Sequence, residues 1–438
     1  MNAEKYILGT SKFIIVAACL LPLLLKAENT PANLELKDDS IVRIECDYTG
    51  KDDNIEVFKN PKTNSETPAD NTKKTGFHYD LYIPEGYNTD PKASYPCMFI
   101  ASPGGNANMG KMAKRLKQDR WVVVMLVESK NDDNTWAVNF LAAHDDVVKR
   151  MRIAGGAKFA TGLSGGSRCC STYPLLRSGF SGIVCQSAGF AYKNTSSAGI
   201  IDFYAKYPRQ VAVAGTFGSK DFNLMESYTI WTILPAGSRK WIEIFEGGHE
   251  WCSADTFGRA MDWMEERVFV DKPVKPESSN FLLKGGTGVE PPGKNAYLWY
   301  FEVVKRRAAS ADSKYEKYLL LLRRNTVAAN GGLAAVPSVK TEMASISTDI
   351  SQLKTDLEVQ KEALAKVDYD AIQKIYASID DEMPRGQHEF NKRILSSKEK
   401  KLFDDYYKAC DKFLAKYPNS FYSKGLSSRK TALNIEFK

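Results

Sequence analysis

Hydrophobic residues in the middle of the chain form short continuous runs, and between these runs they recur every three or four positions. The short runs are typical of buried strands, and the spaced segments are typical of helices with one apolar face. Strands are predicted near 77–83, 97–101, 121–127, 157–163, 182–187, 210–217 and 240–246. Helices are predicted near 108–118, 135–153, 165–177, 224–233 and 254–267. This alternation favours a mostly parallel sheet covered by helices on both faces.

The pattern changes towards both ends of the chain. Residues 28–75 are polar, with one strand-like run at 40–46, and Pro- and Gly-rich sequence at 271–294 predicts a linker. Residues 295–438 are helical in pattern throughout, which predicts a separate C-terminal helical domain after a catalytic domain at 76–270.

Within the C-terminal region, apolar residues step alternately by three and four positions, as in the a and d positions of a coiled coil. The residues in these positions are Met343, Ile346, Ile350, Leu353, Leu357, Leu364 and Val367, with Gln360 as one polar break. The seam predicts a coiled-coil hairpin or helical bundle, with 315–322 as its partner. Docking to a partner protein, self-association and packing against the rest of the chain all remain open.

The N-terminus carries Lys5 and Lys12 before an apolar run at 13–25. This arrangement predicts a secretory signal peptide, residues 1–27, and therefore a secreted or periplasmic protein. Two alternatives are an uncleaved membrane anchor and a lipoprotein attached at Cys19, because the residues before Cys19 resemble a lipobox.

The formal net charge of the 438-residue chain is +7, and the basic residues form no dense block. Nucleic-acid binding is therefore not expected. Seven cysteines follow the predicted signal peptide, so at least one would be unpaired. A bridge from Cys252 to Cys169 or Cys170 is one possibility, and buried free thiols are the favoured interpretation. No His or Cys spacing indicates a metal site, and no cofactor is expected.

The candidate chemistry begins at Gly162, Ser164 and Gly166, which fit G-x-S-x-G between a predicted strand and a predicted helix. This nucleophile elbow presents a serine hydroxyl on a sharp turn, and small residues must flank it because the strand and helix approach closely. Asp221 and His249 follow later, each just after a predicted strand. The order Ser, Asp, His is that of α/β-hydrolases and predicts a nucleophile, an orienting acid and a general base.

An oxyanion hole is expected on the loop after the strand at 97–101, where Ser102-Pro-Gly-Gly-Asn106 follows. The backbone N–H groups of Gly104 or Gly105, together with that of Gly165, are the predicted donors. An ordinary Pro-Gly-Gly turn is the alternative. Trp251, two residues after the predicted base, is the best candidate for a substrate-binding wall.

Three segments carry a resemblance to a known family. They are Gly162-Leu-Ser-Gly-Gly166, Phe180-Ser-Gly-Ile-Val-Cys-Gln-Ser-Ala-Gly189 and Gly247-Gly-His-Glu-Trp251. Over residues 76–270 the chain resembles the polyhydroxybutyrate-depolymerase and feruloyl/acetylxylan-esterase group of α/β-hydrolases. It departs from that group at Ser102-Pro103, where His-Gly is usual, and at Gly218-Ser-Lys-Asp221, where Gly-Thr-x-Asp is usual.

The resemblance and the predicted triad together imply a secreted serine esterase that works through an acyl-enzyme. Its implied substrates are acetyl or feruloyl esters on polysaccharide, or a polyester. A serine peptidase of the prolyl-oligopeptidase type needs the same triad and is the first alternative. A non-catalytic binding protein on a hydrolase scaffold is the second.

Overall fold

The computed structural model describes most of the chain between residues 36 and 436. The described residues are 36–50, 75–131, 133, 135–190, 207–227, 230, 234–235, 237–272, 290–382 and 396–436. The predicted signal peptide and Cys19 lie outside them, as do residues 273–289 of the predicted linker. In the part of the chain that is described, no helix is both long enough and apolar enough to cross a membrane.

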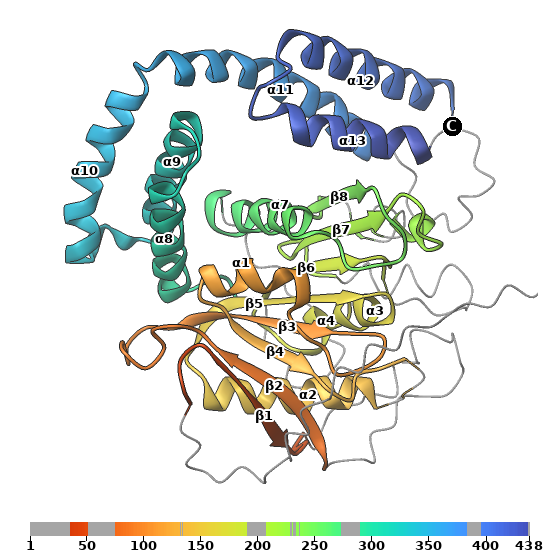
Figure 1. The fold of residues 1–438 in the computed structure, drawn as a ribbon, viewed down its shortest axis with the longest axis vertical. Coiled ribbons are helices and arrows are strands. Elements are labelled where there is room, and N and C mark those ends of the chain that lie inside the picture. Colours follow the sequence, from red (N-terminus) through yellow and green to blue (C-terminus); the bar gives the residue numbers. More distant parts are fainter. Residues whose placement is uncertain are drawn as a thin grey trace, which may run out of the picture.

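One sheet of eight strands forms the centre of the molecule (Figure 1). The strands are β1 Ser40–Cys46, β2 Phe77–Ile83, β3 Tyr95–Ala101, β4 Val122–Leu126, β5 Ile153–Leu163, β6 Phe180–Gln186, β7 Ala212–Gly218 and β8 Lys240–Phe245. Their order is β1-β2-β4-β3-β5-β6-β7-β8, and only the pairings made by β2 are antiparallel. The strands β3 to β7 are buried along their whole length except at the two ends and one inner position of β5, as expected for a sheet covered on both faces.

Helices cover the two faces of this sheet. Those in the described part of the first 272 residues are η2 Gly110–Met112, α1 Ala113–Gln118, α2 Trp136–Arg150, α3 Gly165–Cys170, α4 Tyr173–Leu176, η3 Leu224–Glu226, α7 Ala254–Glu265 and the π-helical turn η4 Glu266–Val270. One hydrophobic core lies between the sheet and α2, α3 and α4. A second lies between the opposite face and α1 and α7. The predicted α/β-hydrolase fold class is confirmed.

The predicted helix at 165–177 is divided into α3 and α4. Pro174 lies in the first turn of α4, where its missing N–H costs no hydrogen bond. The preceding Thr172 instead donates its N–H to the carbonyl of Cys169 (3.0 Å). Of the helix predicted at 224–233, the structure describes η3 and the separate residue 230.

The C-terminal helices begin with α8, which packs directly on the sheet. Among the residues that the structure describes after 290, they are α8 Lys294–Ala309, α9 Lys314–Asn330, η5 Leu333–Ala335, α10 Pro337–Leu353, α11 Leu357–Glu382, α12 Ser397–Lys416 and α13 Ser423–Glu436. Trp299 of α8 stacks edge-on against Trp121, with ring centroids 5.1 Å apart, and donates its Nε1–H to the Asp119 carbonyl (2.9 Å). The second core therefore continues from the sheet through α8 into α9 and α10.

A buried cluster of charges fastens α8 to α1 and α7. Arg307 of α8 forms ion pairs with Asp119 (2.5 Å) and Glu265 (2.8 Å). Arg115 of α1 pairs with Glu265 (2.9 Å) and Asp262 (2.8 Å). Burial disfavours the charged form of Arg307, but the surrounding carboxylates outweigh this cost and raise its pKa well above the ordinary value. The buried arginines and carboxylates thus neutralise one another, and this holds the cluster together.

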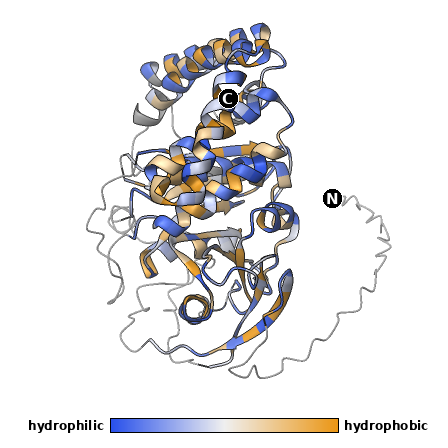
Figure 2. Ribbon diagram, turned by 90° about the vertical axis from the view of Figure 1, so that its left-hand side faces the viewer, coloured by the Kyte–Doolittle hydropathy of each residue, from blue (hydrophilic) through white to orange (hydrophobic). Residues whose placement is uncertain are grey.

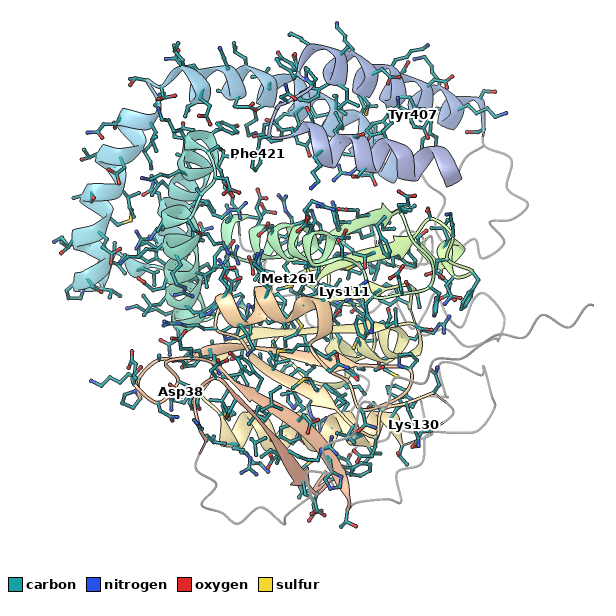
Figure 3. The ribbon with its side chains drawn as sticks, in the orientation of Figure 1. Asp38, Lys111, Lys130, Met261, Tyr407 and Phe421 are labelled. Atoms are coloured by element: carbon teal, nitrogen blue, oxygen red, sulfur yellow. The ribbon has the colours of Figure 1, made fainter. Side chains whose placement is uncertain are left out.

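The last three helices have a small core of their own. It is formed by Ala365 and Ile372 of α11, Phe403, Tyr406, Cys410 and Phe413 of α12, and Leu426 of α13. Helices α11 to α13 show alternating hydrophobic and hydrophilic residues at the top of Figure 2. Phe421, labelled in Figure 3 beside the start of α9, packs edge-on against Tyr315 with ring centroids 5.8 Å apart. These helices return to the sheet where α13 lies beside β8, the last strand of the sheet (Figure 1).

The predicted coiled-coil seam is wrong for the described helices. Residues 354–356 form a turn between α10 and α11, and Asp356 accepts the Glu358 N–H (2.9 Å) at the start of α11. Met343 to Leu353 do pack on the second core. Beyond the turn, Leu357, Leu364 and Val367 are 72%, 66% and 66% exposed. The turn rotates the helix so that a different face of α11 is buried.

Seven cysteines lie in the described residues, and all are buried and unbridged. The favoured interpretation as buried free thiols matches this arrangement, and no disulfide joins Cys252 to Cys169 or Cys170. Burial raises the pKa of the Cys252 thiol to about 12. Such a thiol is protonated at neutral pH and therefore a poor nucleophile.

Candidate active site

Ser164 lies on the sharp turn between β5 and α3. Its backbone has φ 54° and ψ −120°, outside the regions that residues with a Cβ normally occupy. The turn is fixed by two backbone hydrogen bonds. The Ser164 N–H donates to the Gln186 carbonyl (2.9 Å), and the Arg168 N–H donates to the Ser164 carbonyl (3.2 Å). A strained serine held in this way at a strand-to-helix turn has the geometry of a nucleophile elbow.

The glycines around Ser164 are required by close backbone approach. A Cβ on Gly162 would lie 2.7 Å from the Ser167 nitrogen, and one on Gly166 would lie 2.6 Å from the Ala101 carbonyl carbon. Cβ atoms in proteins essentially never come so close to backbone atoms. The G-x-S-x-G pattern is therefore explained by packing of the elbow against itself and against the end of β3.

Asp221 and His249 form a hydrogen-bonded pair. The Nδ1 atom of His249 lies 2.9 Å from Oδ1 of Asp221, whose side chain is completely buried. The same Asp221 oxygen accepts the Asn223 N–H at 2.7 Å. A bond from Nδ1–H to a buried carboxylate fixes the imidazole tautomer and leaves Nε2 able to take up a proton.

Neighbouring backbone bonds hold the two loops that carry this pair. The loop after β7 is tied to the loop after β8 by Ser219 N–H to the Phe245 carbonyl and Lys220 N–H to the Gly247 carbonyl, both 2.8 Å. The end of β6 supports the histidine loop as well, because the Ser187 hydroxyl donates to the Glu250 carbonyl (2.9 Å). Three adjacent parallel strands thus position the acid and the base.

The three predicted triad residues lie at the carboxyl ends of β5, β7 and β8, the same edge of the sheet. This edge is on the right in Figure 1. The structure brings Asp221 and His249 into direct contact. Among the described residues, no hydrogen bond joins the Ser164 hydroxyl to His249, so this third contact stays a prediction.

The two candidate glycines of the predicted oxyanion loop differ in how their N–H groups are used. The N–H of Gly105 donates to the Ser102 carbonyl within the turn (3.1 Å), so it is already used. Gly105 has φ +70°, and a Cβ there would meet the Val127 carbonyl, so this position requires glycine. In the described part of the chain the N–H of Gly104 makes no such bond, which leaves Gly104 and Gly165 as the candidate donors.

Several residues at the site were not predicted from the sequence. Asn131 lies against the elbow, since a Cβ on Gly165 would be 2.9 Å from its Cγ. Lys111 of η2 pairs with Glu250 (3.1 Å) and donates to the Trp251 carbonyl (3.1 Å). No sequence motif marks these residues, because the loops that carry them meet the site only in the folded chain.

One aromatic ring lies beside the predicted base, and a second aromatic residue follows it in the chain. The ring of Phe222 is 78% exposed and stacks on His249, with centroids 4.1 Å apart. Trp251 is half-buried and packs against the second core, so its role as a substrate wall stays a prediction. Among the described residues, no three His, Cys, Asp or Glu side chains cluster as a metal site would require.

No protein-family model and no curated protein matches this sequence. Solved structures that resemble it include a ferulic acid esterase, with 13% identity, 52% of this chain and 99% of the esterase covered, and a TM-score of 0.38. An IroE-like serine hydrolase from Shewanella oneidensis has 14% identity, coverage of 60% and 96%, and a TM-score of 0.37. Est1E from Butyrivibrio proteoclasticus has 13% identity, coverage of 44% and 94%, and a TM-score of 0.32.

Proposed function

We propose that this protein is a serine hydrolase that cleaves carboxylic esters through an acyl-enzyme. Ser164 is the nucleophile, His249 the general base and Asp221 the residue that orients it. The observation that carries the proposal is the hydrogen bond from His249 to a completely buried carboxylate, at the edge of the sheet where a serine stands on a strained turn. Folding alone does not require a buried carboxylate, an imidazole and an elbow serine at the same edge of the sheet, so a shared catalytic role is the better explanation.

In the proposed reaction, His249 Nε2 takes the proton of the Ser164 hydroxyl as its oxygen attacks the ester carbonyl carbon. The C–O bond to the leaving alcohol then breaks, and the alcohol oxygen receives that proton from the imidazolium. Water repeats the sequence on the acyl-enzyme, with His249 as base, and releases the acid. Asp221 keeps its charge throughout and stabilises the imidazolium.

The oxyanion of each tetrahedral intermediate would be held by the N–H groups of Gly104 and Gly165. Removal of one such donor typically lowers kcat by about 10²–10³-fold. Phe222 stacks on the base and Trp251 follows it by two residues, and both rings would suit an acyl or alcohol group with an aromatic or sugar ring. The proposed substrates are acetyl or feruloyl esters of polysaccharide, or a polyester, and the proposed site of action is outside the cytoplasm.

Fluorophosphonate labelling tests the proposal most directly, because it reports an activated serine without assuming the substrate. Labelling should occur in the wild type and be absent in Ser164→Ala. Turnover of acetylated xylan, methyl ferulate and a hydroxyalkanoate oligomer then identifies the acyl group. Ser164→Ala should keep only the rate enhancement that substrate binding and the remaining oxyanion donors provide. This enhancement is about 10³-fold over the uncatalysed reaction in water.

Two other functions make different predictions in the same assays. A peptidase would cleave dipeptidyl amides faster than p-nitrophenyl acetate, whereas the esterase should show the reverse. A binding protein on a hydrolase scaffold would leave Ser164 unlabelled although it is present and folded. Either result would overturn the esterase proposal.

A further inference from the structure

We propose that the side-chain amide of Asn131 is a further donor of the oxyanion hole, next to the N–H of Gly165. The inference rests on the proposed hydrolase function and concerns a residue that no sequence motif indicates. Two loops, one after β4 and one after β5, meet where Asn131 contacts Gly165.

The carboxamide of Asn131 packs on the elbow residue that follows the nucleophile. A Cβ on Gly165 would lie 2.9 Å from Asn131 Cγ and 3.4 Å from its Nδ2, and the amide oxygen would be closer still. Both polar ends of the carboxamide therefore lie beside the residue whose N–H is the predicted donor. A half-turn about the Cβ–Cγ bond exchanges the two ends, so the NH₂ group can face a negative charge that develops here.

The backbone of Asn131 is joined to the predicted oxyanion loop. Its N–H donates to the Pro103 carbonyl (2.9 Å), and Gly104 forms an isolated antiparallel bridge with Lys130. Lys130 is labelled in Figure 3, on the side of the molecule where the parallel strands end. Asn131 thus connects the loop after β3 with the elbow after β5, and the space between these two loops is where the oxyanion is expected.

A buried polar network holds the loop rigidly just before Asn131. The Ser129 N–H and hydroxyl both donate to Asn139 Oδ1, at 3.0 and 2.9 Å. Asn139 Nδ2 in turn donates to Glu128 (3.0 Å), which also pairs with the His78 ring at 2.8 Å. A donor stabilises a transition state most when its position is fixed before the reaction, and this network supplies such fixation.

The donor count at the site also favours this role. The Gly105 N–H is used by Ser102, so the loop after β3 offers only Gly104. A neutral amide adds a donor without a charge that would alter the Asp221–His249 pair. Among the described residues the Asn131 side chain makes no hydrogen bond, so turning its NH₂ group towards an oxyanion breaks none.

The test compares Asn131→Ala, Asn131→Asp and Lys130→Ala with the wild type. The readouts are kcat and KM for p-nitrophenyl acetate, the inhibition constant of phenylboronic acid, and the melting temperature. The boronate forms a tetrahedral adduct with serine and so measures stabilisation of the oxyanion. Lys130→Ala is the matched control, because it shortens the adjacent exposed side chain on the same loop.

Asn131→Ala should lower kcat by about 10²-fold, the effect of losing one oxyanion donor, with KM nearly unchanged. Boronate affinity should fall in parallel, whereas the melting temperature should not. Asn131→Asp should be slower still, because its carboxylate repels the oxyanion. Lys130→Ala should keep wild-type kcat.

Two results would overturn the inference. One is an Asn131→Ala enzyme with kcat and boronate affinity within threefold of the wild type. The other is equal loss of kcat in Asn131→Ala and Lys130→Ala, which would indicate a general disturbance of the loop. Fluorophosphonate labelling of wild-type Ser164 separates this failure from failure of the proposed function. Labelled wild type with an unaffected Asn131→Ala overturns only the role of Asn131, and unlabelled wild type overturns both.

Discussion

Gly218→Ala should impair the proposed catalytic site without unfolding the protein. Gly218 is the last residue of β7, three positions before Asp221, and it faces the loop that carries His249. A Cβ at this position would lie 2.7 Å from the Gly247 carbonyl oxygen and would overlap the Gly248 carbonyl oxygen. Because ordinary carbon–oxygen contacts are about 3.3 Å, the contact with Gly247 alone requires the two loops to separate by about 0.6 Å, and the overlap with the Gly248 carbonyl oxygen requires more.

This displacement acts directly on the hydrogen bond between Asp221 and His249. A misplacement of about 1 Å can cost a factor of about 10², so we expect kcat to fall by about 10- to 100-fold. The loss of folding stability should be about 1–3 kcal/mol, as for other overpacked sites. The assays are p-nitrophenyl acetate kinetics, urea denaturation and the rate of fluorophosphonate labelling.

Gly248→Ala is the matched control for this experiment. A Cβ on Gly248 meets no atom within 4 Å, although the residue lies in the same loop and next to His249. It should retain kcat within a few-fold. If Gly218→Ala kept wild-type kcat and labelling rate, the reasoning that loop contact fixes the acid–base pair would be refuted.

Three further predictions concern the scaffold. Arg307→Met leaves buried carboxylates short of a partner and should cost about 3–5 kcal/mol of stability in urea denaturation; an unchanged midpoint would contradict this. Burial, and then the nearby Lys158 charge, lowers the pKa of His144 to about 3, so the unfolded chain binds a proton more readily below about pH 6.5. Stability should therefore fall by about 3 kcal/mol between pH 6.5 and 4, and His144→Gln should remove most of this slope; equal slopes would refute the cause. Leu364→Lys with Val367→Lys should change the free energy of unfolding by less than about 1 kcal/mol, since both are exposed, and a large loss would restore the coiled-coil interpretation.

Most of the strands were predictable because buried strands leave strong local signals. Buried parallel strands are continuous apolar runs, and each predicted run became a strand of the central sheet within a few residues. The coiled-coil prediction failed because heptad spacing specifies which residues share a face of a continuous helix. It does not detect a turn such as that at 354–356, after which a new face points inwards.

The candidate site was predictable only where chemistry demands a local motif. Ser164 is marked by its glycines, and His249 follows a strand in a chain with four histidines. The contacts of Asn131 are invisible in the sequence, because they depend on two loops meeting across the sheet edge. The use of the Gly105 N–H is equally invisible, since it depends on the turn formed with Ser102.

The C-terminal helices form a continuous structure with the sheet, and their placement bears on the base. β8 is the end strand of the sheet, and the outer edge of an end strand is the part of a sheet most open to unwanted pairing. Helix α13 lies beside this strand. His249 follows β8 by only a few residues. Contacts that hold β8 in place therefore also help to hold the loop that carries the imidazole. At the other end of this region, α8 completes the second core through Trp299 and Arg307. Helix α8 packs on one face of the sheet, and α13 contacts its end strand β8. The C-terminal helices are therefore connected by packing to the proposed catalytic loop after β8.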